Sequence, residues 1–329
     1  MWRSGNFSDA TATGGAALNS GGTKVLYIAG LGRSGSTILA NSLGQIEGFF
    51  SAGELNFIWK HNVLENRLCG CGQPFHECPV WSRMMDEAFG GMDPRMAKNM
   101  MRLADSGTRT RHIPLMLTAA GRGKLRDRLG EFLDITGRLY GAIADATGSR
   151  VIVDSSKEPA YGYTVGMSSG IDLRVLHLIR DSRAAAYSWQ KKKFQPDTEG
   201  REFMHRHSPA KSAALWDSWN ASTEALWRNG KYLRLRYEDF IADPRDSFES
   251  ILKLIGEPDA ELPLASEREV KLGVSHTVSG NPNRFDTGAV KLKLDTAWQK
   301  KMSTRDRNLV TALTLPLLAR YQYPIPPKN

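Results

Sequence analysis

The sequence predicts an α/β protein in which a central parallel sheet is flanked by helices, with a helical insertion and a C-terminal cap. Three short apolar runs rich in β-branched residues support this class, at Val25–Ala29, Arg150–Asp154 and Leu173–Ile179. Each run is followed by a segment in which apolar residues recur at helical spacing. That alternation is typical of a parallel sheet.

The 55–150 stretch, between the first two predicted strands, is mostly helical and forms the predicted insertion. Within it, Gly123–Ala144 carries apolar residues at helical spacing. The pattern is interrupted at Cys69–Pro79 and at the polar segment Ser106–His112. Before this stretch, Ser36–Leu43 is predicted to be a helix that follows the first strand.

The C-terminal half predicts two long helices, Ala213–Trp227 and Thr304–Arg320, of which the second closes the chain. Tyr232–Tyr237 is the fourth predicted strand. A further helix opens at Asp243, which supplies a capping carboxylate just before a proline in the first turn. The Glu269–Leu294 stretch is rich in Gly, Asn and Pro, and we expect it to be irregular.

Composition restricts the class of protein and of ligand. The 329 residues are 41% hydrophobic and 24% charged, as in a globular protein, and 44 Lys and Arg against 35 Asp and Glu give a net charge of +9. A basic excess favours anionic ligands without distinguishing nucleotides, sulfated or phosphorylated sugars, nucleic acids and membranes.

Residues 1–22 are rich in Gly, Ser, Ala and Thr and have no apolar signal-peptide core, so we expect a flexible leader before a single domain at 23–329. No apolar run is long enough for a membrane-spanning helix, and a cytoplasmic location is the expectation.

A glycine-rich loop joins the first strand to the first helix and predicts an anion site. Its sequence from Gly30 to Thr37 approximates the Gly-x4-Gly-Lys-Ser/Thr loop of nucleotide triphosphatases, but Ser36 stands where the lysine would be. The cation is instead inside the loop, as Arg33. Backbone amides of the loop and of the helix N-terminus can still hold an anion. A glycine-rich turn without a ligand is the alternative.

A second anion site is predicted after the strand that ends at Ile179. Arg180 lies at the carboxyl end of this strand, and Ser188 follows two helical turns later. Because both then face one edge of the sheet, they can converge on one phosphate. A surface ion pair of Arg180 and Arg183 with neighbouring acids is the alternative.

Together these motifs resemble those of the PAPS-dependent sulfotransferases, and bacterial and carbohydrate-type members most closely. The family's fold is a P-loop-kinase-like sheet and its donor is 3′-phosphoadenosine 5′-phosphosulfate (PAPS). The resemblance runs from about Lys24 to Tyr323, and its departure is Ser182 in place of the usual proline. It implies that the donor's 5′-phosphosulfate is held by five loop residues, Arg33, Ser34, Gly35, Ser36 and Thr37.

The resemblance also implies the remaining donor contacts. Arg180 and Ser188 correspond to the family's 3′-phosphate motif, and Tyr237 to a tyrosine beside the adenine. Arg284, in a late loop that closes over the nucleotide in many members, is our candidate for a further 3′-phosphate contact.

Three residues are candidates for the chemistry. Glu54 resembles the glutamate base that several members carry soon after the phosphate loop, and Lys157 and Arg33 are expected to stabilise charge on the leaving group. Glu54 could instead complement a helix N-terminus, and Lys157 could be a surface lysine on a turn. His61, His76, His205 and His207 are possible bases to which no motif points.

The three cysteines fall within ten residues, which is not the pattern of a secreted disulfide scaffold. With His76, Cys69, Cys71 and Cys78 could complete a zinc site, although the spacing is not that of a standard zinc finger. A disulfide and free thiols are the alternatives, and in each case we expect a structural role on the acceptor side. No metal is expected in the catalytic step.

The predicted activity is transfer of the sulfuryl group of PAPS to a hydroxyl or amine of a small-molecule, glycan or glycolipid acceptor, with PAP as product. The alternatives are a P-loop kinase or nucleotide triphosphatase, and a non-catalytic anion- or nucleic-acid-binding protein. We expect no nucleic-acid partner, because the basic residues are scattered. We expect the acceptor site to be formed by Phe57–Trp81, the helical insertion and the Trp-rich helix Ala213–Trp227.

Overall fold

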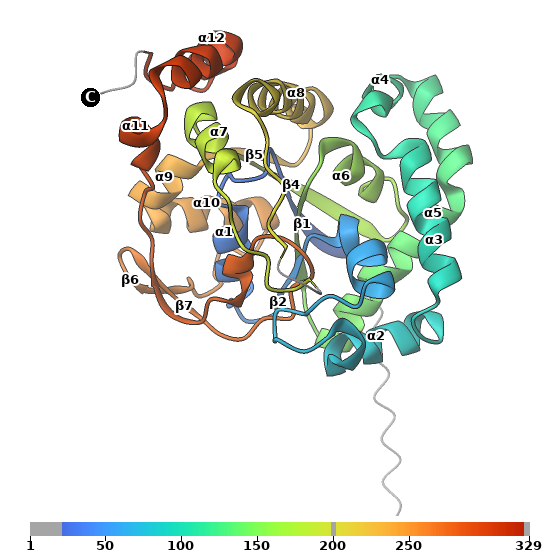
Figure 1. Cartoon of the computed structure of the whole chain (residues 1–329). Helices are drawn as coiled ribbons and strands as arrows, with labels where there is room; N and C mark the ends of the chain where they lie inside the picture. Colours follow the sequence, from blue (N-terminus) through green and yellow to red (C-terminus); the bar gives the residue numbers. More distant parts are fainter. Residues whose placement is uncertain (1–21, 199–201, 326–329) are drawn as a thin grey trace, which may run out of the picture.

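The computed structural model describes residues 22–198 and 202–325, so the predicted leader lies outside the described residues except for Gly22. Five parallel strands form a central sheet in the order β2-β3-β1-β4-β5 (Figure 1). The strands predicted from sequence are β1 (Thr23–Ala29), β3 (Val151–Lys157), β4 (Ile171–Ile179) and β5 (Tyr232–Arg236). The predicted class, a parallel sheet flanked by helices, is confirmed.

The edge strand β2 (Phe49–Gly53) was not predicted from the sequence. It pairs in parallel with β3, with Phe49 opposite Val151 and a register shift between Ser51 and Gly53. A strand of five residues that ends in Ala-Gly offers little periodicity, and its pairing partner lies about a hundred residues away along the chain. The strand matters for function because Glu54 follows it directly.

Helices cover both faces of the sheet because successive strand residues point to opposite sides. Val25 and Tyr27 of β1 pack in one core with α5 (Ala119–Thr147) and α6 (Pro159–Val165). Leu26 and Ile28 pack in a second core, whose helices are α1 (Ser36–Leu43), α9 (Tyr237–Ala242) and α10 (Pro244–Ile255). The sheet therefore has no exposed face.

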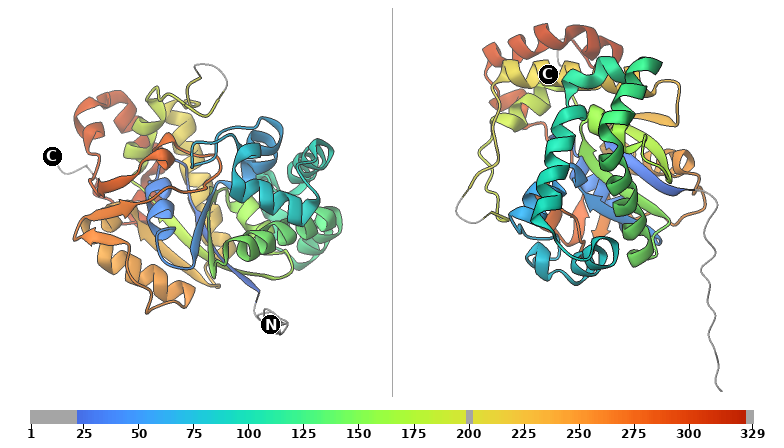
Figure 2. Two further views of the ribbon diagram at one scale, coloured as in Figure 1. Left: turned by 90° about the horizontal axis from the view of Figure 1, so that it is seen from below. Right: turned by 90° about the vertical axis from the view of Figure 1, so that its right-hand side faces the viewer.

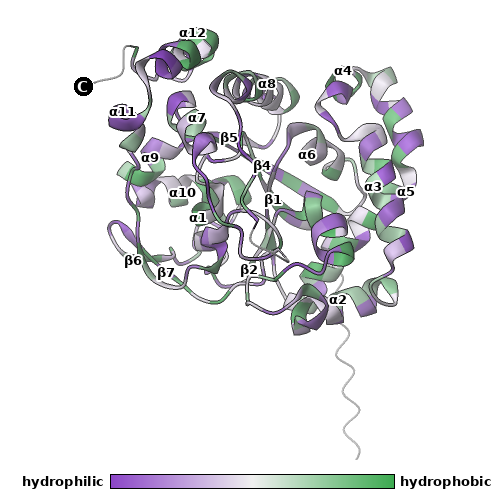
Figure 3. Ribbon diagram, in the orientation of Figure 1, coloured by the Kyte–Doolittle hydropathy of each residue, from purple (hydrophilic) through white to green (hydrophobic). Residues whose placement is uncertain are grey.

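The 55–150 stretch is mostly helical, as predicted. A 3-10 turn at Leu55–Phe57, a π-helix at Ile58–Leu64 and a 3-10 turn at Phe75–Glu77 come first. They are followed by α2 (Pro79–Phe89), α3 (Pro94–Gly107), α4 (Ile113–Met116) and α5. Asp93 and Thr118 cap α3 and α5 by accepting backbone N–H groups of Arg95 and Gly121. Hydrophobic and hydrophilic residues alternate along α3 and α5 (Figure 3), so each buries one face.

The C-terminal cap is helical. α7 (Ser182–Gln190) follows β4, and α12 (Thr304–Arg320) packs on α8 (Pro209–Trp227) above the sheet, as the right-hand view of Figure 2 shows. The short helix α11 (Ala297–Lys301) connects to α12. Among the helices of the described ranges, none has both the length and the apolar character needed to cross a membrane.

The prediction that Glu269–Leu294 is irregular was wrong in part. Three short strands, β6 (Leu264–Ser266), β7 (Glu269–Leu272) and β8 (Gly288–Lys291), form a second, antiparallel sheet. Their short length and the Gly and Asn residues between β7 and β8 conceal them in the sequence. Between β7 and β8 the chain runs through a 3-10 turn at Pro282–Phe285.

Buried His177 on β4 makes the stability of the fold depend on pH. Its ring nitrogens lie 2.7 Å from the Tyr232 hydroxyl and 2.8 Å from Asn220 Oδ1, and burial lowers its pKa from 6.5 to about 4. Between these values the unfolded chain binds the proton and the folded chain does not. Stability from this group is therefore full above pH 6.5 and is lost as the pH falls towards 4.

Urea denaturation of wild type and His177→Gln at several pH values isolates this effect. We expect the difference in unfolding free energy between the two proteins to shrink by about 2 kcal/mol from pH 7.5 to pH 5. Burial raises the pKa of Asp154 to about 6. Because Asp154 is present in both proteins, its contribution cancels in the difference between their unfolding free energies. Parallel pH profiles of the two proteins would contradict the assignment.

Candidate functional site

A cleft of about 830 Å³ lies at the carboxyl edge of the central sheet. Every strand of the sheet brings a residue to it. The β1–α1 loop follows β1, and four single residues end or follow the other strands: Glu54 after β2, Lys157 at the end of β3, Arg180 after β4 and Tyr237 after β5. This edge is where open parallel sheets bind ligands, and the volume suits a nucleotide-sized molecule.

The loop between β1 and α1 bends sharply around Gly35. This residue has φ 88°, and a Cβ at its position would lie 2.3 Å from Cε2 of Tyr237, so only glycine fits. No side chain caps the N-terminus of α1, whose first residue is Ser36. Gly35, Ser36 and Thr37 line the cleft, so the backbone N–H groups of this turn are available to a ligand there.

Arg33 is a half-buried cation, and two of its side-chain nitrogens lack a partner in the part of the chain that the structure describes. Its Nε and Nη2 are buried and have no hydrogen-bond partner among the described residues. Its Cζ lies 4.9 Å from the centre of the Trp189 ring, and burial lowers its pKa. Its φ of 71° places it in the left-handed region, which is strained for a residue other than glycine. Because Arg33 lines the cleft, an anion there would satisfy these groups.

Arg180 connects the loop to the second wall of the cleft. Its Nη1 donates to the backbone oxygen of Arg33 at 3.0 Å, and its Cζ lies 5.0 Å from the Tyr237 ring centre. Its Nε has no partner among the described residues. Ser188, two turns along α7, lines the same cleft, as the sequence predicted for a pair that can share one phosphate.

Glu54 and Lys157 form an ion pair inside the cleft. Lys157 Nζ lies 2.6 Å from Glu54 Oε1, and the two side chains are 10% and 13% exposed. Lys157 also donates to the backbone oxygen of Ser155 at 2.6 Å, and its φ is 71°. The Glu54 backbone N–H donates to Val278 O at 2.8 Å, which ties the residue to the loop after β7. A carboxylate and an ammonium are thus held together beside Arg33.

Two predicted donor contacts do not line the cleft. The Ser34 hydroxyl is buried behind the loop and has no partner among the described residues. Arg284 is 2% exposed, and its guanidinium is ion-paired with Asp197 at 3.0 Å and donates to the backbone oxygens of Leu68 and Thr277. The sequence predicted that Arg284 contacts the 3′-phosphate of the donor. In the structure its guanidinium instead binds other parts of the chain and holds the loop in place.

Several cleft residues were missed in the sequence. Lys193 lines the cleft beyond the end of α7 and donates to Asn281 Oδ1 at 2.5 Å. Burial and the neighbouring Arg33 lower its pKa. Lys291 and Lys293, in and after β8, line the cleft as well. The run of three lysines at 191–193 was the available signal, but only tertiary contacts separate a binding face from a solvated one.

Few residues of the stretch predicted to form the acceptor side line the cleft. From the 55–150 stretch, the described cleft lining includes Phe57, His61 and Arg67. His61 lies 3.2 Å from the Ser279 hydroxyl and stacks on Phe57, and burial lowers its pKa to about 4, so its imidazole is neutral at pH 7. Among the tryptophans of this part of the protein, Trp189 lines the cleft, whereas Trp59, Trp81, Trp216 and Trp219 do not.

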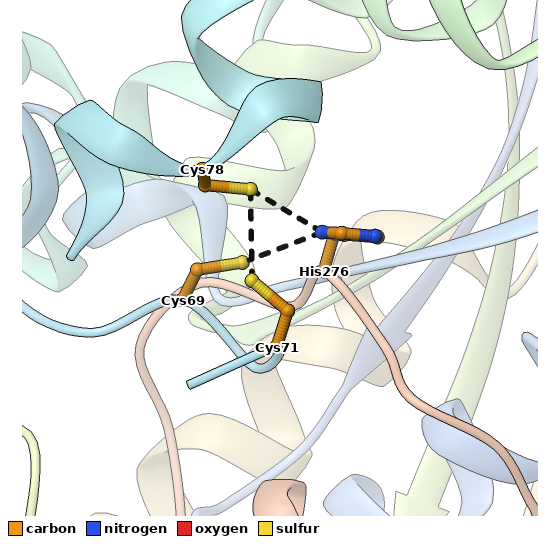
Figure 4. A group of neighbouring side chains, drawn as sticks. All are labelled: Cys69, Cys71, Cys78 and His276. Carbon is orange, nitrogen blue, oxygen red and sulfur yellow. Dashed lines mark hydrogen bonds between the residues drawn. The ribbon is translucent and has the colours of Figure 1, made fainter. Parts of the chain in front are cut away.

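The three cysteines lie outside the cleft, and all three are free. The histidine beside them is His276 and not His76, as Figure 4 shows. His76 is instead turned away, with Nε2 3.0 Å from the backbone oxygen of Val63. The predicted fourth member of the group was therefore wrong, and the disulfide alternative is not formed in this structure.

Comparison with known proteins agrees with this geometry. The model of a family described as "Sulfotransferase family" matches residues 26–261. A sulfotransferase domain of the Synechococcus PCC 7002 olefin synthase is similar in structure, with TM-score 0.52, 18% identity, and 92% of this chain and 96% of that chain covered. A sulfotransferase domain of the curacin biosynthetic pathway gives TM-score 0.50, 14% identity, and 92% and 98% coverage. No curated protein sequence matches significantly.

Proposed function

We propose, starting from the fact that this chain belongs to the sulfotransferase family, that it moves the sulfuryl group of PAPS onto a hydroxyl or amine of an acceptor. The observation that carries the proposal is the convergence of Arg33, Arg180 and Lys157 on one cleft that also holds Glu54. Two of these cations, Arg33 and Arg180, have buried N–H groups without a partner among the described residues. A ligand with two separate anionic groups, such as PAPS, satisfies both.

The two anionic groups of PAPS match the positions of the cations and hydrogen-bond donors in the cleft. The 5′-phosphosulfate lies on Arg33 and the turn formed by Gly35, Ser36 and Thr37, where the helix N-terminus adds backbone donors. The 3′-phosphate lies on Arg180 and Ser188, and the adenine ring lies by Tyr237. Ser34 and Arg284, which do not line the cleft, have no ligand contact in this proposal.

The transfer is an in-line displacement at sulfur. Glu54 accepts the proton of the acceptor hydroxyl as the oxygen forms its bond to sulfur, and the bond from sulfur to the bridging oxygen breaks. That oxygen leaves with the electron pair as the 5′-phosphate of PAP, and Lys157 and Arg33 stabilise its charge. The proton then passes from Glu54 to solvent. These cations supply the positive charge, so the step requires no metal.

The donor assignment is tested by calorimetric titration of PAP, without magnesium, into wild type and Arg180→Ala. Loss of a charge-assisted hydrogen bond to the phosphate is expected to weaken PAP binding about 10- to 100-fold. Arg245→Ala is the matched control, because this arginine is exposed on α10. Absence of PAP binding to wild type, together with good binding of ATP and magnesium, would favour the kinase alternative instead.

The acceptor class is inferred from the aromatic residues that line the cleft. Phe57 and Trp189 are aromatic surfaces among polar and basic side chains, which suits a sugar or another hydroxylated small molecule. We therefore keep a glycan, glycolipid or small-molecule acceptor as the proposal. The role of the 55–150 helices in acceptor binding and a cytoplasmic location stay predictions.

A further inference from the structure

Four potential metal ligands converge outside the proposed donor cleft. They are the thiols of Cys69, Cys71 and Cys78 and the imidazole of His276, whose ligand atoms all lie within 4.8 Å of one another. Figure 4 shows the four side chains pointing toward a common centre. His276 is 198 residues from Cys78 in the sequence, so the group exists only in the folded chain.

Three of the distances between these atoms can be compared with those of a tetrahedral zinc site. Cys78 Sγ lies 3.3 Å and Cys69 Sγ 3.8 Å from His276 Nδ1, and Cys71 Sγ lies 3.8 Å from Cys78 Sγ. Ligands at about 2.3 Å (sulfur) and about 2.0 Å (nitrogen) from a tetrahedral zinc ion are separated by about 3.8 Å for two sulfurs and about 3.5 Å for sulfur and nitrogen. The three distances lie close to these values, and every other pair of ligand atoms lies within 4.8 Å.

A disulfide explains this group of four side chains less well than a zinc ion does. A disulfide requires a sulfur–sulfur distance of about 2.05 Å and joins two cysteines, which leaves the third cysteine and the histidine unexplained. Cys69 and Cys78 are 0% exposed. Cys71 and His276 are half-buried. Three thiols and one imidazole complete a set of four ligands, with no place left for a substrate, as in structural zinc sites.

Hydrogen bonds fix the backbone around the four ligands. Gly72 N–H donates to Cys69 O at 2.9 Å and Cys69 N–H to Gln73 O at 2.8 Å, and these bonds close a turn from Cys69 to Gln73 that contains Cys71. The Trp81 indole donates to His276 O at 2.7 Å. Arg284 donates to the backbone oxygens next to two ligands, those of Leu68 and Thr277. The ligand set is therefore preorganised from both sides.

We propose that Cys69, Cys71, Cys78 and His276 bind a structural zinc ion. The three cysteines bind as thiolates and release their protons to solvent, and neutral His276 binds through Nδ1. No electron transfer is involved.

The consequence of this site is to fix one wall of the cleft. His276 begins the segment in which Val278 pairs with β2, through Val278 N–H to Ala52 O at 2.9 Å and Glu54 N–H to Val278 O at 2.8 Å. Two residues further on, Gly280 packs against the Glu54 carboxylate, where an added Cβ would lie 2.9 Å from Oε1. Zinc would join the Cys69–Cys78 segment to this loop, and so hold Glu54 in position from a distance.

The test is the metal content of the full-length protein, purified under reducing conditions without a chelator or a histidine tag. We expect about one zinc ion per chain by mass spectrometry, retained through gel filtration. Substitution with cobalt is expected to produce the visible absorption of a tetrahedral ion and a thiolate charge-transfer band. These two measurements use the wild-type protein, so they do not depend on whether a variant folds.

Variants separate this ligand set from other sources of metal. His276→Ala is expected to weaken zinc binding at least tenfold in competition with a chromogenic chelator, because it removes a direct ligand. His76→Ala is the matched control and should retain zinc, since its ring contacts Val63 O. The inference is overturned if reduced wild type neither contains zinc nor binds added zinc or cobalt, or if His76→Ala loses the metal while His276→Ala keeps it. Because these readouts measure metal, their failure leaves the donor proposal intact.

Discussion

Replacing Glu54 with glutamine is expected to lower kcat for sulfuryl transfer by about 10²- to 10⁴-fold while PAP still binds, because the amide cannot accept the acceptor proton. The substitution preserves side-chain size and one oxygen that can accept a hydrogen bond from Lys157, which lies 2.6 Å from Glu54 Oε1. An effect confined to kcat is the sign of a group that acts in the transition state. This prediction depends on the proposed donor and mechanism.

The measurement is release of PAP from PAPS with an acceptor obtained from a screen, alongside calorimetric titration of PAP. Glu202→Gln is a matched control, because it removes the same charge from another position on the cleft. Wild-type kcat in Glu54→Gln would exclude the residue as the base. Equal loss of PAP binding and kcat would instead mean that Glu54 orders the site for the donor.

Replacing Arg183 with methionine is expected to destabilise the protein by about 3–5 kcal/mol, the usual cost of breaking a buried ion pair by removing one partner. The Arg183 side chain is 0% exposed, and its Nε and Nη2 donate to Asp181 at 2.9 and 2.6 Å. Its Cζ lies 5.0 Å from the Trp298 ring centre. Methionine fills most of the apolar stem and leaves the Asp181 carboxylate buried without its partner.

Urea denaturation of wild type and variant measures this loss. The double variant Asp181→Asn/Arg183→Met is expected to recover part of it, because asparagine carries no charge and can still accept the Arg183-position backbone N–H at the start of α7. Arg245→Met, on an exposed position, controls for loss of an arginine. A change below about 1 kcal/mol in Arg183→Met would mean that water replaces the guanidinium.

Arg183 also shows why neighbouring residues of one motif separate in the fold. Arg180 and Arg183 are three residues apart at the end of β4, and from the sequence both were candidates for a surface ion pair. Arg180 directly follows β4 and lines the cleft, whereas Arg183 is the second residue of α7 and is buried in the protein. The position of Arg180 at the strand end was predictable, but the burial of Arg183 depends on contacts with Trp298 of α11 and with the Pro324 backbone oxygen.

The sequence by itself determined the local units. The strand, loop and helix from β1 to α1, the strand with Arg180 at its end, and α12 with the bounds Thr304–Arg320 all follow from apolar spacing, glycine positions and capping residues, which act within a few residues of each other. Because parallel strands end at one edge, the same reasoning placed Arg33, Arg180 and Lys157 together.

Only the tertiary structure decided which distant segments meet. β2 pairs with β3 across about a hundred residues, Arg284 turns to Asp197 instead of the cleft, and His276 takes the place beside the cysteines that proximity in sequence suggested for His76. The physical reason is the same in each case. Such contacts come from pairing and burial between segments far apart in the chain, and the periodicity within a segment carries no information about its partner.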